Sequence, residues 1–431
     1  MPLPAAHSAP SSRTRIRTSK GNLSNAYVSG MHEALSMYGN EYTYAQTMYT
    51  IAYAIMQIPS TSIIQRVRPS IWLAAMEICW GAFTFAQVGP KSVPELYAFR
   101  FLVGSFESSF FPSLFYLLGS WCTKTELAKR VALVHMTAPL GTAFGGYLQA
   151  VVYENLDGSH GVEGWRWLYI VCGCMTVPVG IAMFFILPDT PYNTRVWFLD
   201  EKERDLARER VMRAGKAPPV KITLGTIKEI LGAGNSMRLW WFLIQSKLYG
   251  PSCGGNGYFT IWLKAENFSV LNAIKFAFVL IPLVRLPPRK YNYVHQVEWK
   301  VQMCGLLPNG ILAFRPTSLA LKEFAFLTIG VQLMTAIFYP WANEVCADNN
   351  EQRAVVVSSM NGFLYAVAAW LPIVIFPQTM APSFCDAGYG FPATFGLVIA
   401  AIVSAIVIRL FIWRDERRAK QIAAGGEEPV V

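Results

Sequence analysis

The chain has 431 residues, of which 53% are hydrophobic and only 15% charged, and its formal net charge is +10. Water-soluble domains carry about 25% charged residues, so this composition excludes an ordinary soluble protein. The basic residues fall in short loops between long apolar runs, without an RRM, zinc-finger or homeodomain pattern, which excludes a nucleic-acid partner.

We expect an all-α membrane protein with twelve spanning helices in two groups of six. A helix rises about 1.5 Å per residue and needs ~20 residues to cross the hydrocarbon core. The first group comprises the apolar stretches 22–37, 44–64, 71–89, 96–121, 131–153 and 166–187. The second comprises 239–263, 269–284, 301–314, 323–342, 354–376 and 391–413. The stretches 22–37, 269–284 and 301–314 are short for a complete crossing.

The fourth stretch, 96–121, contains Arg100 and Glu107. A carboxylate at this depth costs about 2.5–3.5 kcal/mol unless it is protonated, paired or facing water. Seven residues are close to two helical turns, so both side chains are expected on one helix face, about 10 Å apart. Arg100 is the candidate for binding an anion and Glu107 the candidate proton carrier, since arginine binds carboxylates with a planar fork. The alternative is a structural polar pair in the bundle interior.

Other polar residues lie in or beside apolar stretches. Asn25, Asn256 and Asn361 are candidates for hydrogen bonds to a polar substrate, or they join helices to one another. Tyr258 offers an aromatic face to the apolar part of a substrate. His135 is a possible site residue, although a lone histidine on an apolar helix is more often a core residue.

The hydrophilic segment 189–238 separates the two groups. Asp200 followed three residues later by Glu203 is a capping-box pattern, which predicts a surface helix over 200–214. Glu201 with Arg204, and Asp205 with Arg208, are spaced as ion pairs on that helix.

Lysine and arginine are distributed unevenly between alternate loops. The loops 37–43, 154–164 and 377–390 contain neither residue, whereas the linker and the opposite loops are basic. Cytoplasmic loops are the basic ones, so both termini and the linker should be cytoplasmic. The predicted units are an N-terminal tail (1–19), a six-helix bundle (20–188), the linker (189–238), a second bundle (239–413) and a C-terminal tail (414–431).

Two further groups of residues follow from this orientation. A cytoplasmic gate of ion pairs is expected from charged residues that flank the cytoplasmic loops of each half: Arg66, Arg68, Glu344, Asp348 and Arg353. Asn267 begins an Asn-Phe-Ser glycosylation sequon in a predicted outer loop.

Several segments carry a resemblance to a known family. The run RFLVGSFESSFFPSLFYLLGSWCTKTELAKR (Arg100–Arg130) is followed by GWRWLYI (Gly164–Ile170). Further segments are NLSNAYVSGM (Asn22–Met31), IPSTSIIQRVRPSIW (Ile58–Trp72), YFTIWLK (Tyr258–Lys264) and NEVCADNNEQRAVVVSSMN (Asn343–Asn361). Together they resemble the fungal anion:cation symporter branch of the major facilitator superfamily, which includes allantoate and pantothenate permeases. The resemblance implies two six-helix halves that rock about a midplane site, with Glu107 at the position of the proton-coupled acid.

The chain departs from the family pattern in two places. The family has a full first helix with an acidic–basic pair where this chain has Ser19 and Lys20. After Val270 the eighth helix is short and contains Lys275. We therefore expect a major facilitator fold in which helices 1 and 8 are degraded.

The expected function is proton-coupled import of a small organic anion, a vitamin-like carboxylate such as pantothenate, by a monomer in the plasma membrane. The alternatives are efflux of a secondary metabolite, or a non-transporting membrane remnant or interaction protein. No GxSxG, HExxH or Walker motif is present, so an enzyme and an ATP-driven pump are not expected. The eight cysteines form no CxxC motif, and neither a metal nor a cofactor is expected.

Overall fold

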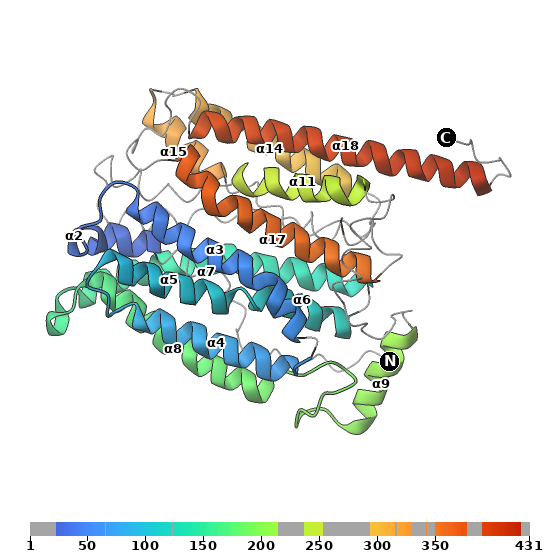
Figure 1. The fold of residues 1–431 in the computed structure, drawn as a ribbon, viewed down its shortest axis with the longest axis horizontal. Helices are drawn as coiled ribbons and strands as arrows, with labels where there is room; N and C mark the ends of the chain where they lie inside the picture. Colours follow the sequence, from blue (N-terminus) through green and yellow to red (C-terminus); the bar gives the residue numbers. More distant parts are fainter. Residues whose placement is uncertain are drawn as a thin grey trace.

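The computed structural model describes residues 23–64, 66–122, 124–213, 237–252, 294–314, 317–329, 342, 350–376 and 390–423. Within this part of the chain the regular structure is helical, without a strand. The long helices lie side by side with their axes roughly along one direction (Figure 1). We call the helices up to α8 the N-terminal half and those from α11 onward the C-terminal half.

The helices of the N-terminal half agree with the predicted stretches. After a helical segment at 23–26 come α2 (His32–Ala34), α3 (Glu41–Ile64), α4 (Pro69–Ala86), α5 (Val93–Glu107), α6 (Phe110–Trp121), α7 (Lys124–Leu156) and α8 (Gly164–Ile186). Between the halves lies α9 (Glu201–Arg213).

The C-terminal half contains α11 (Met237–Ser252), α14 (Val294–Ala313), α15 (Leu319–Thr328), α17 (Asn350–Ile375) and α18 (Phe391–Ala423). Among the residues that the structure describes, three segments are long and apolar enough by themselves to cross a membrane: Val93–Leu118, Gly164–Ile186 and Phe391–Arg414. The predicted eighth helix and the residues before Leu23 lie outside the described part.

The first helix is interrupted near its middle. Gly30 has a φ of +108°, a conformation that glycine adopts without steric cost. The Ser29 hydroxyl donates to the Asn25 carbonyl at 2.8 Å, and the Gln149 amide of α7 donates to the Ser29 oxygen at 2.8 Å. The break is therefore held by the neighbouring helix as well as by local sequence.

The predicted span 96–121 is present as α5 followed directly by α6, and the two together form the membrane-length segment Val93–Leu118. The helical hydrogen-bond pattern is interrupted after Glu107, at Ser108 and Ser109, whose backbone angles remain helical. Pro112 has no N–H group and cannot donate to the carbonyl four residues earlier, that of Ser108. Gln57 of α3 donates to that carbonyl instead, at 3.2 Å. The candidate proton carrier thus lies next to a buried backbone acceptor that lacks its helical donor and is bound by another helix.

Gly104 sets how closely α5 approaches α3. A Cβ atom added at this position would overlap the main-chain carbonyl oxygen of Tyr49. The contact is backbone against backbone, so no flexible side chain can yield. Gly104 lies between Arg100 and Glu107 along the helix, and its lack of a side chain therefore helps to position both.

Gly104→Ala is expected to push α5 away from α3 and to lower the melting temperature of the purified protein. Overpacking of this kind costs about 1–3 kcal/mol. Gly396→Ala on α18 is the matched control, since no atom lies within 4 Å of its added Cβ. Equal melting temperatures for the two variants would show that α5 moves aside without cost.

The linker helix was largely predicted. In α9 the Glu203 carboxylate accepts the Asp200 N–H at 3.1 Å, as a capping box requires. Asp205 and Arg208 form the expected ion pair at 3.0 Å. The expected Arg204 pair differs: its guanidinium donates to the Leu199 carbonyl, at 2.8 and 3.1 Å.

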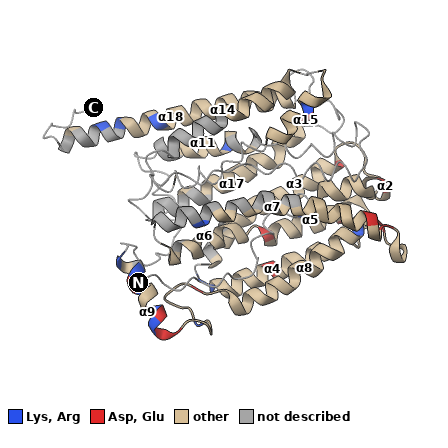
Figure 2. Cartoon of the chain, turned by 180° about the vertical axis from the view of Figure 1, so that it is seen from behind, with Lys and Arg blue, Asp and Glu red and all other residues tan. Residues whose placement is uncertain are grey.

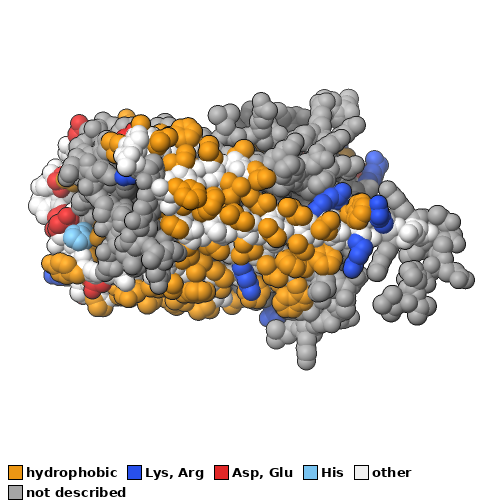
Figure 3. Space-filling view, turned by 90° about the horizontal axis from the view of Figure 1, so that it is seen from above, with side chains coloured by type: hydrophobic (Ala, Val, Ile, Leu, Met, Phe, Trp, Pro, Cys, Tyr) orange, Lys and Arg blue, Asp and Glu red, His pale blue; other side chains and the backbone are white. Residues whose placement is uncertain are grey.

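The surface has the character of a membrane protein. Figure 3 shows a broad belt of hydrophobic side chains, with Lys and Arg gathered toward the end near the C-terminal tail and Asp and Glu toward the opposite end. Charged residues are sparse along the middle of the described helices in the cartoon view as well (Figure 2).

Candidate functional site

Arg100 is fully buried in α5, at 0% exposure. Its guanidinium carbon lies 4.8 Å from the centre of the Tyr49 ring on α3, a cation–π contact. Its charge also interacts with the hydroxyl groups of Tyr42 on α3 and Tyr169 on α8. The Tyr169 hydroxyl is buried and makes no hydrogen bond to the described residues. The site therefore combines a permanent cation with aromatic walls and polar hydroxyls.

Glu107 lies on the same face of α5 as Arg100. The buried residues of this helix recur at the spacing of one helical face, and both of them belong to it: Val93, Leu96, Arg100, Val103, Gly104 and Glu107. Glu107 is only 4% exposed. The hydroxyl groups of Ser108 and Ser109 turn back to carbonyls of their own helix, at 2.7 and 2.9 Å.

Asn361 lies where the two halves meet. Its side-chain amide donates to the Gln57 side-chain oxygen at 2.9 Å, and Gln57 in turn donates to the Ser108 carbonyl. All three groups are buried. Asn361 therefore joins helices in this structure, the alternative reading of its role. Sequence reasoning missed Gln57, although it is a polar residue inside the predicted stretch 44–64.

The other candidates are distributed differently. Asn25 is buried, and its carbonyl accepts the Ser29 hydroxyl. His135 and Arg353 lie on α7 and α17, but their side chains are outside the described part. The remaining candidates are also outside it: Asn256, Tyr258, Asn267, Glu344 and Asp348.

Arg68 forms its ion pair within the N-terminal half, not across a gate between the halves. Its Nε and Nη2 atoms lie 2.8 and 2.7 Å from one carboxylate oxygen of Asp189. The other oxygen accepts the Ser70 N–H at 2.9 Å, and the Asp189 carbonyl accepts the Trp121 indole N–H at 2.8 Å. Asp189 thus ties together the ends of α4, α6 and α8. Arg66 is exposed, and its gate role stays a prediction.

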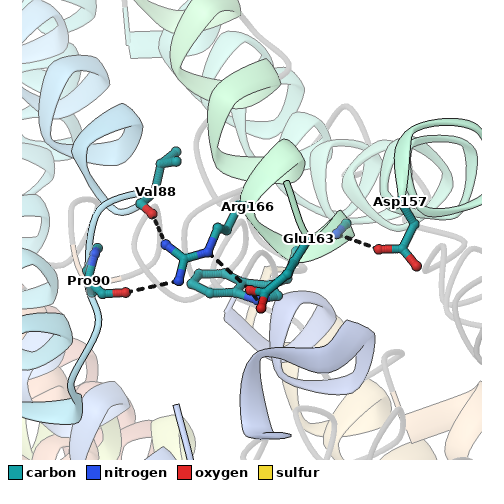
Figure 4. Close-up of polar contacts among 7 residues, drawn as sticks. Val88, Pro90, Asp157, Glu163 and Arg166 are labelled. Carbon is teal, nitrogen blue, oxygen red and sulfur yellow. Dashed lines mark hydrogen bonds and ion pairs between the residues drawn. The ribbon is translucent and has the colours of Figure 1, made fainter. Parts of the chain in front are cut away.

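A second polar cluster lies at the opposite end of the same half (Figure 4). Arg166 donates to the carbonyls of Val88 and Pro90 and pairs with Glu163 at 3.1 Å. Asp157 accepts the Gly164 N–H, the first of α8, at 2.7 Å. The cluster joins the α4–α5 loop to the start of α8, and it accounts structurally for part of the GWRWLYI segment.

At this same end the two halves are packed together. One cluster of buried apolar residues contains Leu23, Met37 and Trp165 from the N-terminal half and Leu312, Phe326 and Phe391 from the C-terminal half. Tyr42 and Tyr169, which adjoin Arg100, belong to the same cluster. Arg100 therefore lies beneath a layer of apolar side chains contributed by both halves.

Besides Gln57, further buried or half-buried polar residues in the described spans escaped sequence reasoning, among them Glu77, Lys247 and Gln245. Glu77 on α4 is 4% exposed. The Lys247 ammonium on α11 lies 4.7 Å from the centre of the Phe363 ring on α17. Gln245, also on α11, is fully buried, and neither atom of its amide group bonds to a described residue. The sequence could have indicated these residues, since a charged or amide side chain inside an apolar stretch is a candidate for function.

Comparison with known proteins gives one consistent result. The family profile of the Major Facilitator Superfamily matches residues 16–426. The chain is 30% identical to the pantothenate transporter liz1 of Schizosaccharomyces pombe, over 94% of this chain and 79% of the relative. It is 28% identical to the pantothenate transporter FEN2 of Saccharomyces cerevisiae, over 92% and 80%. The human organic anion transporter MFSD10 has a similar structure, with a TM-score of 0.58 and 13% identity over 92% of this chain and 100% of that one.

Proposed function

The chain belongs to the Major Facilitator Superfamily, and from that premise we propose that it imports a small organic anion together with protons. Members of this family are multi-pass membrane transporters rather than enzymes. Alternating access means that two halves rock about a site near the midplane. The organisation into two bundles around the linker 189–238 is part of the proposal.

The buried Arg100 carries the substrate proposal. A guanidinium enclosed by helices and next to Tyr49 keeps its charge and can bind a carboxylate with two hydrogen bonds. Pantothenate has one carboxylate, an amide and two hydroxyl groups, and the Tyr169 hydroxyl is available for such a ligand. The names of the relatives in two yeasts support the same vitamin-like substrate class.

Glu107 is the proposed proton carrier. It is a buried acid two helical turns from Arg100, at the point where the helical hydrogen-bond pattern between α5 and α6 is interrupted. Intramembrane acids of this kind commonly serve in proton relays. A substrate carboxylate at Arg100 competes for the same positive charge, so substrate binding and proton binding at Glu107 favour each other.

Direct uptake tests the function. Yeast cells that lack their own pantothenate transporter, once they express this protein, are expected to accumulate labelled pantothenate above its external concentration. Accumulation should rise as the medium is acidified and collapse when a protonophore is added. Faster loss of preloaded substrate would instead favour efflux. A protein that reaches the plasma membrane and moves nothing in either direction would favour the non-transporting alternative.

We also propose a plasma-membrane protein with both termini in the cytoplasm. The gathering of Lys and Arg at the end that carries α9 supports this orientation (Figure 3). A glycosylation acceptor inserted near Ser159 should be modified and one near Ala217 should not. Modification at Ala217 alone, measured as a gel shift removed by glycosidase, would reverse the orientation.

A further inference from the structure

A chain of hydrogen bonds runs from the C-terminal half to the backbone beside Glu107. It begins at the Asn361 amide on α17, passes through the Gln57 side chain on α3 and ends at the Ser108 carbonyl. The two bonds measure 2.9 and 3.2 Å, and every member is buried. The contact joins residues 304 positions apart in sequence.

The chemistry of the chain fixes its direction. The Ser108 carbonyl can only accept, and Pro112 has removed its helical donor. Gln57 must therefore present its N–H group to Ser108 and its oxygen to α17. Asn361 must then donate. The Gln57 amide cannot turn over without losing both hydrogen bonds. A change in the strength of one bond therefore affects the position of Gln57 and, with it, the other bond.

We infer that Gln57 is a positioning residue of the transport cycle. Through Gln57, the strength of the contact between α3 and α17, and so between the two halves, depends on whether Glu107 is charged. The inference rests on the proposed role of Glu107 as proton carrier. Ser108 follows Glu107 directly, so protonation removes a full negative charge from the neighbourhood of the carbonyl that Gln57 binds. A poorly polarisable interior screens this change weakly, and the strength of the Gln57 bond changes with it.

Other ionisable groups surround this level of α5 and have to be separated from Glu107 in any test. Those described on the elements packed around it are Tyr49, Tyr53, Glu77, Cys79, Tyr116 and Tyr365, with Arg100 on α5 itself. Glu77 is the one carboxylate among them. A Glu77→Gln variant is therefore included beside Glu107→Gln.

The α3–α17 contact contains its own control. The Thr47 hydroxyl donates to the Ala369 carbonyl at 2.9 Å, nearly three helical turns from Gln57 along α3. Thr47→Val removes one hydrogen bond between the halves without touching the Ser108 joint. Gln57→Met removes the bonds at the joint while keeping an unbranched side chain of similar length.

The first measurement needs no substrate. Melting temperatures of the purified full-length protein are compared for Gln57→Met, Glu107→Gln and the double variant. We expect the effect of Glu107→Gln to shrink once Gln57 is replaced, because neighbouring groups in one network do not add. The effects of Glu107→Gln and Thr47→Val should add, as should those of Glu77→Gln and Gln57→Met. Additivity of Glu107→Gln with Gln57→Met would overturn the inference.

The second measurement is the pH profile of uptake. Gln57→Met is expected to shift the pH of half-maximal uptake by up to about one unit, the equivalent of one ordinary hydrogen bond. Asn361→Leu, which leaves the bond to Ser108 in place, should shift it in the same direction and serves if Gln57→Met folds poorly. Thr47→Val should lower the rate of uptake without shifting the pH of half-maximal uptake.

Equal pH profiles for Gln57→Met and Thr47→Val would show that Gln57 only joins the two halves and does not respond to Glu107. A wild-type protein without pH-dependent uptake would refute the proposed proton coupling, while the melting experiment would still decide the link between Gln57 and Glu107.

Discussion

Glu107→Gln is expected to abolish accumulation of substrate above its external concentration. Glutamine keeps the size and hydrogen-bonding capacity of a protonated glutamate but cannot release a proton. Without that step a pH gradient has nothing to act on, so the variant should only equilibrate substrate. Exchange of labelled for unlabelled substrate across the membrane should continue.

The control for this variant is Glu77→Gln, which removes another buried acid, on α4. Glu77 and Glu107 are each 4% exposed, so the free-energy cost of burying a charged carboxylate is similar at the two positions. If concentrative uptake survives in Glu107→Gln and disappears in Glu77→Gln, the proton carrier is Glu77 on α4 and not Glu107. Loss in both variants would indicate a relay that uses the two acids in sequence.

Arg100→Lys is expected to raise the substrate concentration for half-maximal uptake about ten- to a hundredfold, since one charge-assisted hydrogen bond is worth roughly 1.5–3 kcal/mol. Lysine keeps the charge but loses the planar fork that holds both oxygens of a carboxylate. Its point charge also stacks less well on the Tyr49 ring. The amount of protein at the cell surface should stay near that of wild type.

Arg166→Lys is the matched control, because Arg166 is also held by an aromatic ring and by acceptors but belongs to the structural cluster of Figure 4. It should lower stability without changing the concentration dependence of uptake. Unchanged affinity in a well-expressed Arg100→Lys protein would remove Arg100 from the site. Failure of that variant to reach the membrane would favour a structural role.

The helices of this protein are largely readable from its sequence. Apolar stretches of bilayer length predicted α3, α4, α8 and α17 within a few residues, since a backbone in lipid must satisfy its own hydrogen bonds. They also predicted α7 and α18, but α7 begins earlier, at Lys124, and α18 continues further, to Ala423, because the polar ends of these helices extend beyond the apolar stretch. Local charge spacing predicted α9 and its cap. The placement of Arg100 and Glu107 on one face followed from helical periodicity alone.

The contacts between distant segments were not readable. Asp189 and Arg68 are 121 positions apart, and the sequence around either residue does not indicate that the other is its partner. The same is true of Gln57 and Asn361. The joint after Glu107 is a different case, because Pro112 predicts a freed carbonyl by a local rule that the apolar length of the stretch concealed.

The apolar layer that joins the halves above Arg100 bears on how the protein could be blocked. On the proposed orientation this layer faces the outside of the cell, between the substrate medium and Arg100. To reach Arg100 from outside, an inhibitor would therefore have to displace these apolar side chains. A ligand that binds only after the layer has opened would favour the opposite conformation, and one that binds with the layer in place would favour the arrangement described here.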